Sequence, residues 1–84
     1  MTKDEIWSIS IQRARRFFRE QADVREENPD EFTFGTCRIR LTEPEPGKVG
    51  SWTIRRTRLQ MEGGDADTAV IYHRYFNQFL SAGG

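Results

Sequence analysis

The chain has 84 residues, enough for one small domain with a single core and too few for two. Its 13 lysines and arginines balance 13 aspartates and glutamates, which argues against a protein that coats nucleic acid through bulk positive charge. The lone Cys37 excludes an intramolecular disulfide, and no apolar run has the length of a membrane span or the character of a signal peptide. We therefore expect a cytoplasmic protein that makes no contact with membranes.

The N-terminal third predicts a helix from about Thr2 to Glu27. Thr2 and Glu5 have the spacing of a capping box, and "NPD" at 28–30 is a helix stop. Apolar residues recur at three- and four-residue steps, at Trp7, Ile11, Ala14, Phe18 and Ala22. The stretch "WSISI" also alternates as a strand does, so a short first strand and the order β-α-β-β-α stay open as the alternative.

Two strands are predicted next, over Glu31–Thr42 and Ser51–Glu62, joined by the turn region "EPEPGKVG". We expect a hairpin register that places Leu41 opposite Trp52 and Arg38 opposite Arg55. In this register one apolar set (Ile39, Leu41, Trp52, Ile54) and another (Phe32, Phe34, Leu59, Met61) lie on opposite faces. Helices can cover only one of these faces, so we expect the other to be covered by a partner or by a second copy in a homodimer.

A last helix is predicted from Asp65 or Asp67, either of which can cap it, to about Ser81. Its expected buried stripe consists of Ala69, Tyr72, Phe76, Phe79 and Leu80, with His73 beside it. The sequence thus predicts a single compact domain over residues 1–84. Its fold class is α+β with the order α-β-β-α, in which a two-stranded antiparallel hairpin packs against two helices.

Arginine dominates the basic residues and is concentrated on the predicted hairpin. Its guanidinium group pairs bidentately with carboxylate or phosphate and stacks on flat surfaces. The hairpin arginines are Arg38, Arg40, Arg55, Arg56 and Arg58. Together with Trp52 as an aromatic anchor, they form the predicted partner-binding site, because Arg and Trp dominate binding hot spots. The alternative is that carboxylates of the same chain neutralise these arginines. The acidic residues near the end of the first helix are interpreted as a solvated helix end.

No catalytic motif is present, and we expect neither enzyme activity, nor a metal site, nor a cofactor. Cys37 is expected to be a small core residue, His73 to be a packed or partly exposed histidine, and Asp65 and Asp67 to belong to a helix N-terminus. The sequence therefore favours a non-catalytic interaction or regulatory protein that docks on a protein partner, of the kind that phages and mobile elements use to modulate host machinery. The alternative is a nucleic-acid-binding protein that places the arginines on phosphates and stacks Trp52 on a base.

Overall fold

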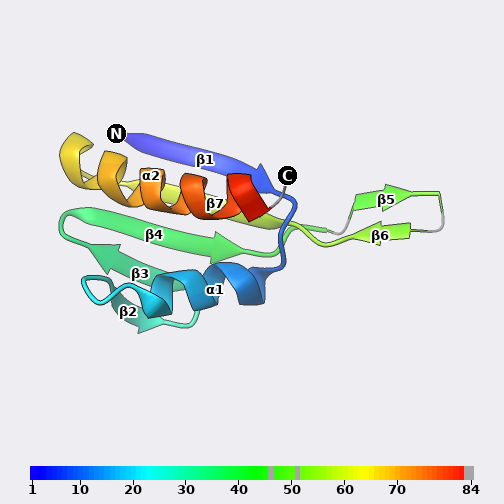
Figure 1. The fold of residues 1–84 in the computed structure, drawn as a ribbon, viewed down its shortest axis with the longest axis horizontal. Coiled ribbons are helices and arrows are strands. Elements are labelled where there is room, and N and C mark those ends of the chain that lie inside the picture. Colours follow the sequence, from blue (N-terminus) through cyan, green and yellow to red (C-terminus); the bar gives the residue numbers. More distant parts are fainter. Residues whose placement is uncertain (46, 51, 83–84) are drawn as a thin grey trace.

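A computed structural model describes residues 1–45, 47–50 and 52–82 of the chain, with the backbone alone for 47–49, 52–54 and 81–82. The strands and helices, shown in Figure 1, are β1 (Thr2–Trp7), α1 (Ile11–Glu20), β2 (Arg25–Asn28), β3 (Glu31–Phe34), β4 (Cys37–Thr42), β5 (Gly47–Val49), β6 (Trp52–Ile54), β7 (Thr57–Glu62) and α2 (Asp65–Ala82).

Five of the described strands form one antiparallel sheet in the order β1-β7-β4-β3-β2. Strands β5 and β6 pair only with each other, as a ribbon that projects from the end of the sheet (Figure 1). The predicted α-β-β-α order with a two-stranded hairpin is therefore wrong, although the α+β class is right. The sheet order also puts the first strand of the chain at one edge, beside a strand from near its C-terminal end.

The predicted helix over Thr2–Glu27 is wrong at both ends, because its first residues form β1 and its last residues belong to β2. Strand β1 alternates between exposed and half-buried side chains and pairs with β7 along its whole length. Helix α1 begins only after Ser10, whose hydroxyl accepts a hydrogen bond from the backbone N–H of Arg13. The capping-box pattern at Thr2 was overridden by long-range strand pairing. The open alternative is right that a strand comes before the helix, but this strand is Thr2–Trp7 and not "WSISI", of which only Trp7 lies in β1, and the alternative order β-α-β-β-α is wrong.

Each predicted long strand is divided in two. The run Glu31–Thr42 folds back at Gly35 and Thr36, where Gly35 has a φ of 57° and no non-glycine residue among those described has a positive φ. A two-residue loop with a left-handed glycine in its first position is the type II′ hairpin turn. The run Ser51–Glu62 is interrupted at Arg55 and Arg56, so β4 pairs with β7, not with β6.

The register that results removes the two-sided hairpin. Leu41 lies opposite Leu59, not Trp52, and Arg38 lies opposite Glu62, not Arg55. The apolar side chains of β3, β4 and β7 consequently share one face of the sheet. Those fully or almost fully buried there are Phe32, Cys37, Ile39, Leu41, Leu59 and Met61. These side chains are therefore buried within the chain itself, and the expected second apolar face that a partner would cover is not formed by them.

Both helices pack on that apolar face, and aromatic rings join them. Phe18 of α1 lies between Phe32 of the sheet and Tyr75 of α2, with ring centroids 5.4 and 5.6 Å away. The buried stripe of α2 differs from the predicted one, because the helix is rotated so that Tyr75 faces the core. Its buried residues are Thr68, Ile71, Tyr75 and Phe79. Of the predicted stripe only Phe79 is buried, while Ala69 and Leu80 are exposed.

Candidate interaction surface

The side of the five-stranded sheet that faces away from the helices is here called the open face. Because side chains alternate along each strand, it carries the residues between the buried ones. Its members are Thr2, Asp4, Ile6, Arg25, Glu27, Glu31, Thr33, Arg38, Arg40, Thr42, Arg58, Gln60 and Glu62. The open face is therefore made of charged and hydroxyl- or amide-bearing side chains, with Ile6 as its one large apolar residue among those described.

Strand register arranges these side chains in rows that cross the sheet. One row contains Thr2, Glu62, Arg38, Thr33 and Arg25, and the next contains Asp4, Gln60, Arg40 and Glu31. Arginines and carboxylates are interspersed, with Arg38 opposite Glu62 and Arg40 opposite Glu31, while Arg38 and Arg40 are neighbours on β4. The sheet thus presents a patterned surface with neither a basic nor an acidic excess.

Most open-face arginines have a carboxylate partner in the same chain. The Arg58 guanidinium donates to both carboxylate oxygens of Asp4, at 2.9 and 2.7 Å, and this hydrogen bonding lowers the pKa of Asp4. Arg40 lies 3.6 Å from Glu31, a looser pair in which the arginine side chain is 60% exposed. Arg38, at the centre of the sheet on β4, is exposed and forms no ion pair with the described residues. It is the open-face cation most available to a partner.

The open face is hollowed over its centre, with a volume of about 580 Å³. Strands β1, β2, β3, β4 and β7 all line this hollow, and Arg38, Arg40, Glu31 and Glu62 are among its side chains. Sites for small molecules are usually enclosed and mainly apolar. This hollow is open and its lining is mostly charged, so its shape and chemistry suit a protruding polar surface of a macromolecule.

The predicted binding residues are divided between two places. Arg38, Arg40 and Arg58 lie together on the open face, whereas Arg55 and Arg56 lie where the β5–β6 ribbon joins the sheet. There Arg56 donates to the backbone carbonyl of Glu45 at 2.7 Å, and Arg55 is exposed. Trp52 is in β6, but its side chain is outside the described part of the chain. Sequence reasoning missed the acidic members of the surface, Asp4, Glu31 and Glu62, because their common face is evident only from the sheet order.

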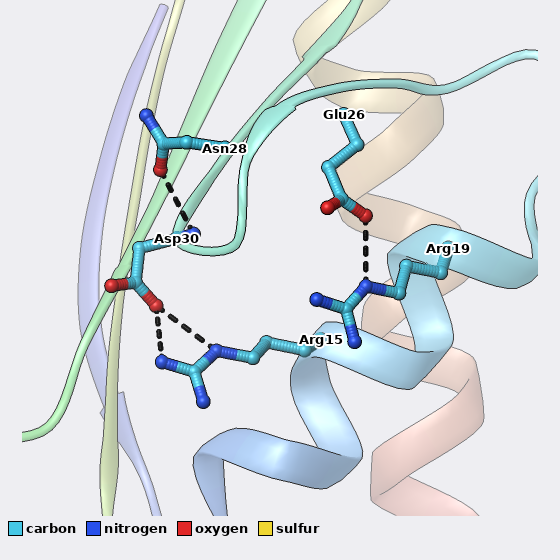
Figure 2. Close-up of polar contacts among 5 residues, drawn as sticks. All are labelled: Arg15, Arg19, Glu26, Asn28 and Asp30. Atoms are coloured by element: carbon cyan, nitrogen blue, oxygen red, sulfur yellow. Dashed lines mark hydrogen bonds and ion pairs between the residues drawn. The ribbon is translucent and has the colours of Figure 1, made fainter.

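Acidic residues after α1 form ion pairs that connect this helix to the β2–β3 hairpin. Figure 2 shows Arg15 of α1 donating from its Nε to Asp30 at 3.0 Å, and Arg19 donating to Glu26 of β2 at 2.8 Å. The same view shows the backbone N–H of Asp30 bonded to the side chain of Asn28, which shapes the β2–β3 turn. These carboxylates hold α1 against the β2–β3 hairpin, so they are not simply a solvated helix end.

The residues considered for chemistry are not brought together. Cys37 is fully buried on β4, and burial raises the pKa of its thiol, which keeps it protonated and unreactive. His73 is exposed on α2. Asp67 accepts hydrogen bonds from the backbone N–H and hydroxyl of Thr36, both at 2.8 Å, so it fastens α2 to the β3–β4 turn. Among the described residues no group of three or more His, Cys, Asp or Glu is placed to hold a metal ion.

Comparison with known proteins supplies no family. A scan against protein-family models and a search of curated proteins both find no match to this chain. Neither described helix combines the length and apolar character needed to cross a membrane. The function is therefore inferred from the geometry of the surface itself.

Proposed function

We propose that this protein is a non-catalytic interaction protein that docks on a protein partner through the open face of its sheet, with Arg38 and Arg40 at the centre of the contact. The observation that carries the proposal is the uncovered, hollowed face on which the neighbouring Arg38 and Arg40 lie opposite the carboxylates Glu62 and Glu31. Complementary patterns of charge select partners and set their orientation more than they add affinity. A regulatory role in the cytoplasm, of the kind expected from the sequence, is part of this proposal.

A protein partner fits this face better than nucleic acid does. Carboxylates from Glu31, Glu62 and Asp4 lie among the arginines and would repel phosphates. Single-stranded nucleic acid is commonly held by aromatic side chains on which bases stack, and none of the described open-face residues is aromatic. A protein surface can instead supply an acidic group for Arg38 and basic groups for the neighbouring carboxylates.

The proposal is tested by a matched pair of charge reversals. Arg38→Glu changes the centre of the open face, and Arg16→Glu makes the same change at an exposed position of α1. Each variant is used as bait in a pull-down from host lysate, with and without nuclease, and affinity for any captured protein is then measured by titration. We expect Arg38→Glu to weaken the specific complex about tenfold or more and Arg16→Glu to leave it unchanged.

Two results would contradict the proposal. The first is a specific complex that survives Arg38→Glu, alone and combined with Arg40→Glu. The second is capture that disappears with nuclease and weakens steeply with salt, which would establish the nucleic-acid alternative. The homodimer expected from the sequence is also proposed, at a different surface of the molecule.

A further inference from the structure

The two edges of the sheet differ in how well they are protected from pairing. Strand β2 is short, carries charged or polar side chains at every position, and has a bulge between Glu26 and Asn28. Short, charged, bulged strands are the usual protection of an edge. Strand β1 at the other edge is longer, regular over Thr2–Trp7, and has no described strand beyond it. It is therefore the edge at which another strand can add.

The hydrogen bonds of β1 identify the groups that are free. The Met1 amine donates to the Gly63 carbonyl at 2.8 Å, and the Gly63 N–H donates back to the Met1 carbonyl at 3.2 Å. Hydrogen-bonded and non-hydrogen-bonded pairs alternate along an antiparallel ladder. Lys3, Glu5 and Trp7 therefore bond to β7. The backbone N–H and C=O groups of Thr2, Asp4 and Ile6 point away from the sheet.

We propose that β1 pairs with β1 of a second copy of this chain, antiparallel and in register about Asp4, so that the two sheets join into one. The free groups of Thr2, Asp4 and Ile6 can then satisfy one another across a two-fold axis. In this register Lys3 of each copy lies opposite Glu5 of the other, Thr2 lies opposite Ile6, and Met1 opposite Trp7. Opposite charges and apolar pairs facing each other across strands are favourable.

The neighbouring registers are less favourable, which makes the pairing specific. Moving the two-fold axis by one residue toward the N-terminus places Lys3 opposite Lys3, and moving it the other way places Glu5 opposite Glu5. Like charges directly opposite each other are destabilising. In the proposed register the two Asp4 side chains are the one pair of like charges that lie opposite each other on β1. Each Asp4 carboxylate is already bonded through both oxygens to Arg58 of its own chain.

Exposed apolar side chains lie on β1 and on the flank of α2 that packs against it. Ile6 is 54% exposed and Met1 45% exposed, and exposed apolar side chains are informative where several lie close together. Above β1, Tyr72 donates to Glu5 at 2.7 Å, and Phe76 packs edge-on against Trp7 with centroids 5.8 Å apart. The flank of α2 that contains these two rings also contains Ala69 and Leu80 by helical spacing, and Leu80 is 55% exposed. Pairing through β1 brings the two α2 flanks toward each other, so the same contact covers both sets.

The inference goes beyond the proposed function, because the edge and the open face are different surfaces and a dimer through β1 leaves both open faces free. It is tested by sedimentation and light scattering over a concentration series of the full chain. We expect the wild type to be a dimer whose dissociation constant rises about tenfold in Lys3→Glu and in Glu5→Lys, each of which creates two like-charge pairs. Arg16→Glu on α1 is the matched control and should leave the dimer unchanged.

Mixing the two charge variants gives the sharpest readout. A copy with Lys3→Glu and a copy with Glu5→Lys place opposite charges at both contacts, so the mixture should recover dimers that neither variant forms alone. Register is read separately from Asp4→Cys, which should form a disulfide-linked dimer under mild oxidation because facing residues in such a pair have Cα atoms about 5.5 Å apart. The buried Cys37 should leave the wild type unlinked.

Three results would overturn the inference. One is a wild-type chain that stays monomeric up to submillimolar concentration. Another is a dimer that Lys3→Glu does not weaken, or whose charge variants fail to recover on mixing although thermal unfolding shows both folded. The third is efficient linkage of Thr2→Cys alone without linkage of Asp4→Cys, since only the residue on the two-fold axis faces its own copy.

Discussion

Truncation of Leu41 tests the face assignment on which the open face depends. Leu41 lies on the central strand β4, is 0% exposed and faces Leu59 across the strand pair. Replacing a buried leucine with alanine costs about 2–5 kcal/mol, because apolar transfer energy is lost and a cavity remains. A domain of 84 residues has a stability of only about 4–13 kcal/mol, so Leu41→Ala should remove a large part of it.

The assay is equilibrium unfolding in urea, followed by circular dichroism and tryptophan fluorescence. With an m-value of about 1 kcal/mol/M, typical of so small a domain, the Leu41→Ala midpoint should fall by about 2 M or more. The matched control is the next residue, Thr42→Ala, which lies on the open face and should change the stability by no more than about 0.5 kcal/mol. Equal effects at the two positions, or a larger effect at Thr42, would refute the division of β4 into a buried and an open face.

Two further predictions concern the attachment of α2 to the sheet. Gly35→Ala should lower the free energy of unfolding, measured in urea, by about 2–3 kcal/mol, because Gly35 has a φ of 57° and an added Cβ would strike the carboxylate of Asp67. Gly50 has a similar φ of 62° but lies in open space, so Gly50→Ala should lower it by only about 1 kcal/mol. A smaller loss at Gly35 than at Gly50 would show that the contact with Asp67 is not tight. Hydrogen bonds from Thr36, Arg74 and Arg58 lower the pKa of Asp67, Asp23 and Asp4 respectively. Protons therefore bind more tightly to the unfolded chain, so this stability is present above the ordinary aspartate pKa of about 3.9 and is lost as the pH falls through the lower folded-state values. The urea concentration at the wild-type unfolding midpoint should therefore decrease once the pH falls below about 4, and this decrease should be smaller in Asp67→Asn. Parallel curves of midpoint against pH for the two proteins, down to about pH 2, would contradict this role of Asp67.

Local signals in the sequence account for part of the fold. Ile11, Ala14 and Phe18 were placed correctly on the buried face of a helix, and a second helix was predicted close to its observed bounds of Asp65–Ala82. The turn at Gly35 was also readable, since a glycine between two alternating apolar runs is a hairpin signal. It was passed over because Glu31–Thr42 was treated as one continuous strand.

The N-terminal segment illustrates a limit of local patterns. Thr2 and Glu5 satisfy a helix-capping pattern, yet Thr2–Trp7 forms a strand, and the alternating "WSISI" pattern lies outside that strand except for Trp7. The choice depends on β7, which supplies a complete antiparallel partner from the far end of the chain. Similarly, the arginines of the candidate surface were identified from the sequence, but their carboxylate neighbours were not.

By itself the sequence determined that this is a small α+β domain with balanced charge, arginines on its strands and apolar residues enough for one core, because composition and spacing are local properties. The tertiary structure alone decided which strands are neighbours. As a result, Leu41 lies opposite Leu59 and not opposite Trp52 as the sequence suggested. The same strand pairing places the apolar side chains of the sheet under the helices and the charged ones together on the open face. The physical reason is that side chains alternate along a strand, so the face each one occupies depends on pairing and register across residues far apart in the chain.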